Sequence, residues 1–135
     1  MRAAFHGFRD SAARRRLNAI THPEIRRRIH EEVERLRASR PEAIVVIDIP
    51  LLLDTTGPEA FELEGVIVVA ASREQQIERL RARDTLSQDE AERRLAAQRP
   101  AGEKEAEADW VIDNSGSIED TRRQVELLWQ ELLVN

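Results

Sequence analysis

Three apolar runs along the chain have the length and composition of buried β-strands. The first, at residues 43–49, is rich in Ile and Val and is followed by Pro50. The second lies at residues 66–71, and a shorter third run lies at residues 110–113. Nearly continuous apolar runs are typical of strands in a parallel sheet that is covered on both faces. We therefore predict three strands, the first of which brings Asp48 to the edge of the sheet where ligands bind.

The part of the chain before the first strand has a helical pattern that is interrupted once. Residues 11–20 are predicted to form one helix. Thr21 followed by Glu24 is a capping-box signal, and Pro23 suits a first helical turn, so a second helix is predicted to begin there and to end near Ser39. The apolar positions expected to face inward are Leu17, Ile20, Ile25, Ile29, Val33 and Leu36.

Three further helices are predicted after the second strand, each with a serine at its start. Ser72 is followed by Gln75 and Ser87 by Glu90, which are capping-box spacings, and Ser117 is placed to cap the closing helix. The apolar positions expected to face inward are Ile77, Leu80, Val125, Leu128 and Leu132.

Strands that alternate with helices indicate an α/β protein. A chain of 135 residues with 41% hydrophobic content can bury a core, so we expect one domain over residues 1–135. Two helical regions stand out in it, at about residues 10–40 and at about residues 79–108.

The composition narrows the function classes. Cysteine is absent and the three histidines are scattered, which excludes a disulfide scaffold and argues against a zinc site. No long apolar segment follows the N-terminus that could be a signal peptide or a membrane span. We expect a cytoplasmic protein without a membrane partner.

The net charge of -5 hides an asymmetry along the chain. Residues 1–40 hold 11 arginines and 5 acidic residues, whereas the rest holds 10 basic and 21 acidic residues. Arginine suits phosphate oxygens, although its excess over lysine equally fits a bias in genomic base composition. Nucleic-acid binding through this basic part ranks last, because aromatic residues are few and no recognised motif is present.

Asp48 is the first candidate for chemistry. A carboxylate at the end of a buried strand is typical of a site beside nucleotide phosphates, where it can hold Mg²⁺ directly or through water. From spacing alone, an acid that accepts neighbouring backbone N–H groups is an equal alternative. The glycine-rich phosphate loop that usually accompanies such a strand is missing, because the only lysine is Lys104, and Glu105 rather than Ser or Thr follows it.

Five segments, in their order and spacing, resemble the dephospho-coenzyme A kinase family, whose members phosphorylate the ribose 3'-hydroxyl of dephospho-CoA with ATP and Mg²⁺. Each segment is a weak signal alone, and together they run from about Asp10 to the C-terminus. They are LNAITHP at 17–23, DIPLL at 48–52, QIERL at 76–80 with RD at 83–84, AAQ at 96–98, and ADWVIDN at 108–114.

The resemblance implies a partial P-loop nucleotide-kinase-like fold, with three layers, a parallel sheet and a helical lid, and it implies roles for particular residues. Arg79 and Arg83 would stabilise the transferring phosphoryl group from the lid at about 79–108, with ATP and Mg²⁺ as cofactors. The acceptor dephospho-CoA would be contacted from the region at about 10–40 and from the segment after the first strand, through His22, Asp48, Pro50, Leu51 and Leu52. Nucleotide binding would fall to Arg94, Asn114 and Gly116.

Each role has a plainer alternative. The arginines could form a solvated helical face paired with nearby acids, His22 could cap a helix, and Gly116 could serve a turn. The chain also departs from the family pattern at Thr85, where a glycine is common.

The family's phosphate loop and its catalytic base lie upstream of anything in this sequence. We therefore expect an incomplete, truncated kinase domain that is inactive alone, and a degenerate nucleotide-binding or CoA-binding module with a regulatory or scaffolding role is the alternative. In the family the missing strand lies between the strands at 43–49 and 66–71. These two strands would then either pair directly or leave apolar edges that promote self-association.

Overall fold

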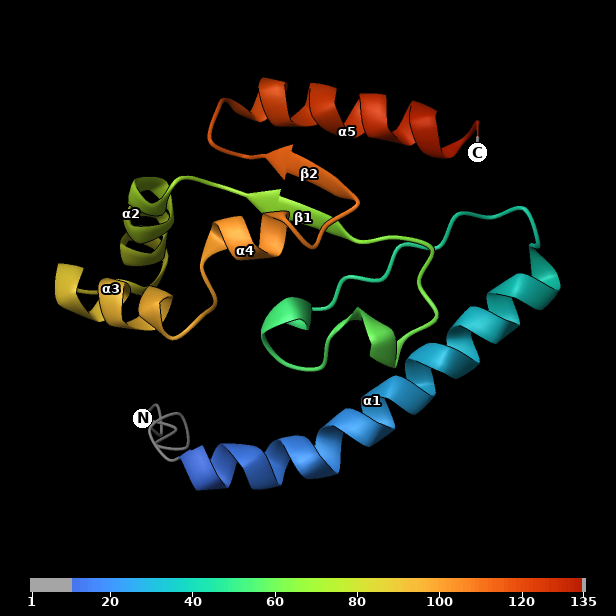
Figure 1. Cartoon of the computed structure of the whole chain (residues 1–135), viewed down its shortest axis with the longest axis horizontal. Coiled ribbons are helices and arrows are strands. Elements are labelled where there is room, and N and C mark those ends of the chain that lie inside the picture. Colours follow the sequence, from blue (N-terminus) through green and yellow to red (C-terminus); the bar gives the residue numbers. More distant parts are fainter. Residues whose placement is uncertain (1–10, 135) are drawn as a thin grey trace. The chain divides into compact units, whose positions relative to one another are not determined.

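The computed structural model describes residues 11–134, without the side chains of Ser11 and Arg14, and the chain divides into two compact units. The first unit is Met1–Asp48 and the second is Ile49–Asn135, and each is described here by itself. Figure 1 shows the elements of both units.

One long helix, α1 at Ser11–Ser39, makes up most of the described part of the first unit. The prediction that a helix ends at Ile20 and another begins at Thr21 is wrong, because α1 runs through Pro23 without a break. The Thr21 hydroxyl donates to the Leu17 carbonyl at 3.0 Å instead of capping a new helix. A proline inside a helix removes one backbone hydrogen bond, which the remaining turns of α1 tolerate.

Ion pairs one turn apart stabilise the part of α1 that follows Pro23. Arg27 bonds Glu24 at 2.7 Å and Glu31 at 2.5 Å, and Arg28 bonds Glu24 at 2.8 Å. Hydrogen bonds from Arg27 and then Arg28 lower the pKa of Glu24 to about 2. Because these side chains are exposed to water, each pair stabilises the helix only weakly.

The apolar positions of α1 are only partly covered. Ile29, Val33 and Leu36 are half-buried, as the helical spacing predicts. Leu17, Ile20 and Ile25 are exposed, so the prediction that they face inward is wrong.

Residues 43–49 do not form the strand that their composition predicts. Val46 is 69% exposed, and Ile44 and Val45 are also exposed. A strand is defined by its hydrogen-bonded neighbour, and among residues 11–134 strand pairing occurs only between the strands at 67–70 and 110–113. The predicted direct pairing of 43–49 with the strand at 66–71 is therefore also wrong. Self-association through free strand edges stays a prediction.

The second unit is built on two parallel strands, β1 at Ile67–Ala70 and β2 at Trp110–Asp113. Ile67 pairs with Trp110 and Ala70 with Asp113, so both strands end at the same edge. The prediction of strands at 66–71 and 110–113 is confirmed. The unit is an α/β structure with a parallel sheet, as predicted, although the sheet has two described strands rather than three.

Three helices connect β1 to β2, and a fourth follows β2. They are α2 at Arg73–Asp84, α3 at Gln88–Ala96, α4 at Ala101–Glu105 and α5 at Ile118–Leu132. In Figure 1, α5 lies along β2 and α4 lies beside β1, and both pairs of elements are in contact.

The predicted serine caps are confirmed. Ser72 accepts from the Gln75 amide, and Ser87 forms a full capping box with Glu90. Ser117 forms another capping box, with Asp120. These local signals place the starts of α2, α3 and α5 correctly, because a cap requires only residues within one turn.

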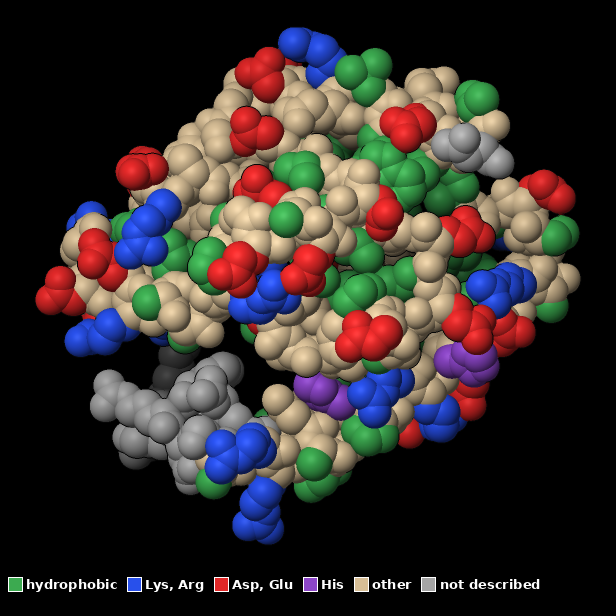
Figure 2. Space-filling model, in the orientation of Figure 1, with side chains coloured by type: hydrophobic (Ala, Val, Ile, Leu, Met, Phe, Trp, Pro, Cys, Tyr) green, Lys and Arg blue, Asp and Glu red, His purple; other side chains and the backbone are tan. Residues whose placement is uncertain are grey.

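The buried apolar core of the described residues is small and lies in the second unit, at Leu53, Ile77, Ala91 and Ile112. Leu80, Leu128 and Leu132 are half-buried, whereas Val125 is exposed, contrary to prediction. Figure 2 shows exposed apolar side chains among charged groups of both signs. None of the described helices has the length and apolar character needed to cross a bilayer.

Candidate functional site

A tight turn at residues 49–55, called the 49–55 turn below, directly follows Asp48. Leu51 has a left-handed backbone with φ of 60°, and a short 3-10 helix follows at Leu52–Asp54. The Thr55 hydroxyl donates to the Leu51 carbonyl at 2.8 Å. Leucine rarely adopts positive φ because its Cβ crowds the backbone, so the surrounding structure must hold this conformation. Pro50 and Leu51 are exposed and Leu52 is half-buried, which leaves the first two able to contact a ligand.

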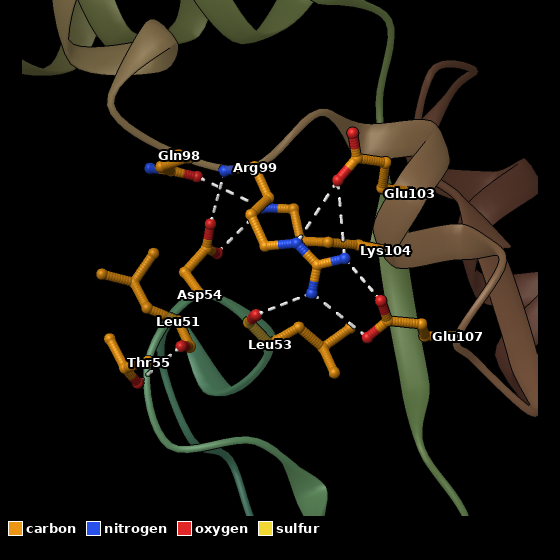
Figure 3. Close-up of polar contacts among 9 residues, drawn as sticks. All are labelled: Leu51, Leu53, Asp54, Thr55, Gln98, Arg99, Glu103, Lys104 and Glu107. Atoms are coloured by element: carbon orange, nitrogen blue, oxygen red, sulfur yellow. Dashed lines mark hydrogen bonds and ion pairs between the residues drawn. The ribbon is translucent and has the colours of Figure 1, made fainter.

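The Asp54 side chain connects this turn to a segment about 50 residues further along the chain. Its Oδ1 accepts from the Arg99 amide at 2.6 Å, and its Oδ2 accepts from Lys104 Nζ at 3.0 Å (Figure 3). The Asp54 side chain is 10% exposed and that of Lys104 is 19% exposed. Burial acts to raise the pKa of Asp54, but the hydrogen bonds from Arg99 and Lys104 outweigh it and hold the pKa below its usual value.

Arg99 adds a second connection to the same turn. Its Nη1 donates to the Leu53 carbonyl at 3.1 Å and to Glu107 Oε2 at 3.2 Å, and its Nη2 bonds Glu107 Oε1. The hydrogen bonds from Arg99 lower the pKa of the Glu107 carboxyl. Asp54, Arg99, Lys104 and Glu107 are called the Asp54 cluster below.

The sequence did not predict the Asp54 cluster, because no local pattern relates Asp54 to Lys104. The one available signal was that Lys104 is the only lysine of a chain whose other basic residues are all arginine.

A second group of predicted residues meets at the carboxyl ends of β1 and β2. The Asn114 amide donates to the Ala70 carbonyl at 2.7 Å, and Arg79 Nη2 donates to the Asn114 carbonyl at 2.9 Å. The Thr121 hydroxyl donates to Asn114 Oδ1 at 3.0 Å. Ligands of open parallel sheets bind at this edge, so the structure brings Arg79 and Asn114 together where a nucleotide site is expected.

Gly116 lies in the same loop, close to the start of α5. A Cβ at this position would stand 3.1 Å from Asp120 Oδ2, an atom that accepts the Ser117 hydroxyl at 2.7 Å. The close approach of the loop to the capping carboxylate leaves little room for a side chain at this position.

Arg83 and Arg94 are brought together by one carboxylate. Arg83 Nε bonds Asp84 Oδ1 at 2.9 Å, and Arg94 Nη1 bonds Asp84 Oδ2 at 2.6 Å. The hydrogen bond from Arg83 is the main reason that the pKa of Asp84 is lowered. Both guanidinium groups stay largely exposed, so both keep free donors for an anionic ligand.

Asp48 and His22 belong to the first unit. His22 is half-buried inside α1, so the expectation that it lies at a helix start is wrong. Asp48 is exposed and is not part of a strand. Among residues 11–134, no three His, Asp or Glu side chains lie close enough together to hold a metal ion by themselves.

Comparison with known proteins decides the family. The sequence profile of the dephospho-CoA kinase family matches residues 3–120. The chain belongs to the dephospho-CoA kinase family. It is 46% identical to the dephospho-CoA kinase of Moorella thermoacetica over 125 residues, which are 93% of this chain and 58% of that protein. It is 44% identical to the dephospho-CoA kinase of Geobacter metallireducens over 124 residues, 92% of this chain and 60% of that protein.

Solved structures agree with the family assignment. The crystal structure of TT1252 from Thermus thermophilus superimposes with a TM-score of 0.72 and 39% identity, covering 93% of this chain and 62% of that one. The dephospho-CoA kinase from Campylobacter jejuni gives a TM-score of 0.60 and 30% identity, covering 93% and 60%. The fold is thus that of part of a nucleotide kinase of this family, and the chain spans about three fifths of its relatives' length.

Proposed function

We propose that this chain carries the acceptor-binding and phosphate-stabilising part of a dephospho-CoA kinase. Such an enzyme transfers the γ-phosphoryl group of ATP to the 3'-hydroxyl of dephospho-CoA, which completes coenzyme A. The observation that carries the proposal is the family match over residues 3–120. The 49–55 turn supports it, because the DIPLL segment leads into a turn with Pro50 and Leu51 exposed.

The acceptor would bind through the segment from Asp48 to Leu52. In an in-line transfer the hydroxyl oxygen bonds to the γ-phosphorus as the bond to the β,γ-bridging oxygen breaks, and the hydroxyl proton goes to a base. We assign acceptor orientation to Asp48 and His22, and pocket lining to Pro50, Leu51 and Leu52. We assign the role of base to none of these residues.

Positive charge for the transferring group would come from α2 and α3. Arg79 and Arg83 are assigned to the phosphoryl oxygens, and Arg94, Asn114 and Gly116 to the nucleotide. Phosphoryl transfer depends mainly on such charge stabilisation and positioning. Magnesium neutralises phosphate charge when it is bound, and one carboxylate such as Asp48 fits it, because Mg²⁺ in kinases is held largely by water and phosphate oxygens.

A second candidate is a binding module without phosphoryl transfer. It is favoured by the contacts of Lys104, the only lysine in the sequence. A phosphate loop uses its lysine to hold the β- and γ-phosphates, but Lys104 Nζ binds the part-buried carboxylate of Asp54. We infer that this chain by itself binds the acceptor and does not transfer phosphate.

Calorimetric titration with dephospho-CoA, together with a chromatographic assay for CoA formation from dephospho-CoA, ATP and Mg²⁺, tests the proposal. We expect saturable binding without CoA formation. The Moorella thermoacetica relative, assayed in parallel, is the positive control. CoA formation by the purified chain would contradict its inferred inactivity, and absence of dephospho-CoA binding would contradict both candidates.

A further inference from the structure

The Asp54 cluster is placed to control the shape of the 49–55 turn. Arg99 and Lys104 both bind the turn. Lys104 Nζ and the Arg99 amide donate to the Asp54 carboxylate, and the Arg99 guanidinium donates to the Leu53 carbonyl. Among the ion pairs of residues 11–134, that between Asp54 and Lys104 is the least exposed. Low exposure strengthens these contacts, because water competes with them less.

The turn needs support from outside itself. Within it, the Asp54 amide and the Thr55 hydroxyl donate to the Leu51 carbonyl at 3.0 and 2.8 Å. The Thr55 and Gly57 amides donate to the Leu52 carbonyl at 3.3 and 2.9 Å, and the Leu52 amide donates to the Ile49 carbonyl at 3.3 Å. All of these bonds are local, and they must hold Leu51 at a φ of 60°, a conformation that a leucine in a free loop would leave. The contacts from Arg99 and Lys104 supply the further constraint.

We propose that Asp54, Arg99 and Lys104 are positioning residues for the acceptor, which hold Leu51 and Leu52 in the conformation that binds dephospho-CoA. This inference rests on the proposed function. The three side chains act through the turn and make no contact with the substrate themselves.

The test uses the Asp54→Asn variant, which keeps the size of the side chain and removes its charge. We expect its affinity for dephospho-CoA, measured by calorimetry, to fall about tenfold, the effect of losing roughly one charge-assisted hydrogen bond. Asp54→Glu, which keeps the carboxylate, should restore most of the affinity. Glu119→Gln is the matched control, because it neutralises an exposed carboxylate paired with Arg122, and it should leave the affinity unchanged.

Hydrogen exchange separates a positioning role from a general loss of structure. In Asp54→Asn the amides of Leu52, Asp54 and Thr55 should exchange faster, while those of β1 and β2 stay as protected as in the wild type. Unchanged exchange in the turn would overturn the proposal. Unchanged affinity for dephospho-CoA in a variant whose turn amides exchange faster would also overturn the proposal.

Two further results are possible, and each has a defined meaning for the proposal. If Asp54→Asn also deprotects β1 and β2, Lys104→Gln replaces it, because glutamine removes the cation that bonds Asp54 and keeps a polar side chain; unchanged affinity there overturns the proposal. If the wild-type chain fails to bind dephospho-CoA, the proposed function is rejected. In that case, faster amide exchange in the turn of Asp54→Asn would still show that the Asp54 cluster stabilises the turn. Unchanged exchange would show that it does not.

Discussion

Replacing Lys104 with Met is expected to lower the free energy of unfolding of the second unit by about 3 kcal/mol. Methionine keeps the apolar stem of lysine but leaves the Asp54 carboxylate, which is 10% exposed, without its cationic partner. The Arg99 amide still donates to Asp54 Oδ1 in this variant, but a part-buried charge that has lost its counter-charge is costly, since water solvates it poorly. Urea unfolding followed by the fluorescence of Trp110 and Trp129, both in this unit, measures the change.

The matched control for this prediction is Arg122→Met. Arg122 pairs with Glu119 at 3.2 Å, with the side chains 63% and 69% exposed, so its loss should cost less than about 0.5 kcal/mol. The double variant Asp54→Asn with Lys104→Met should recover part of the stability, because it leaves no buried charge. Equal losses for Lys104→Met and Arg122→Met would contradict the importance assigned to the Asp54 cluster.

Replacing Gly65 with Ala is expected to destabilise the same unit by about 2 kcal/mol, a typical effect of overpacking. A Cβ at Gly65 would stand 2.3 Å from Cζ3 of the Trp110 ring and 2.8 Å from Cη2. The backbone cannot easily move away, because the next amide, that of Val66, donates to Asp109 Oδ2 at 2.8 Å. The indole must therefore shift, which strains its hydrogen bond to Glu131 Oε1 at 2.9 Å.

Urea unfolding and the emission maximum of tryptophan together measure the effect of Gly65→Ala. Gly102→Ala is the control, since the residue lies in α4 and, apart from its own chain neighbours and helix backbone, no described atom lies within 4 Å of the added Cβ. Alanine there should be neutral or should stabilise the unit by up to about 1 kcal/mol. A Gly65→Ala variant as stable as Gly102→Ala would show that the contact with Trp110 is wrongly described.

The features that the sequence predicted correctly are those with local causes. The caps at Ser72, Ser87 and Ser117 each depend on residues within one helical turn. The strands at 67–70 and 110–113 are short apolar runs that pair with each other in parallel.

The failures of prediction involve competition or distant partners. Thr21 and Glu24 have the spacing of a cap, but the continuing helix gives Thr21 a carbonyl acceptor within α1 instead. Residues 43–49 have the composition of a strand, yet composition does not provide the neighbour that a strand requires.

In the candidate site, too, some residues were predicted from the sequence and others were missed. Arg79 and Asn114 were predicted separately from family motifs, and the structure joins them by a hydrogen bond at the sheet edge. The Asp54 cluster was missed, because the partners of Asp54 lie 45 and 50 positions away and no periodic pattern connects them.

Binding of the acceptor by the segment after Asp48 can be tested directly by a nuclear magnetic resonance titration. Dephospho-CoA is added to the ¹⁵N-labelled chain, and the amide signals of residues 48–55 are followed. We expect saturable shifts of these signals, with the Leu51 and Leu52 amides among the most affected. Saturable binding that leaves residues 48–55 unshifted would contradict this expectation.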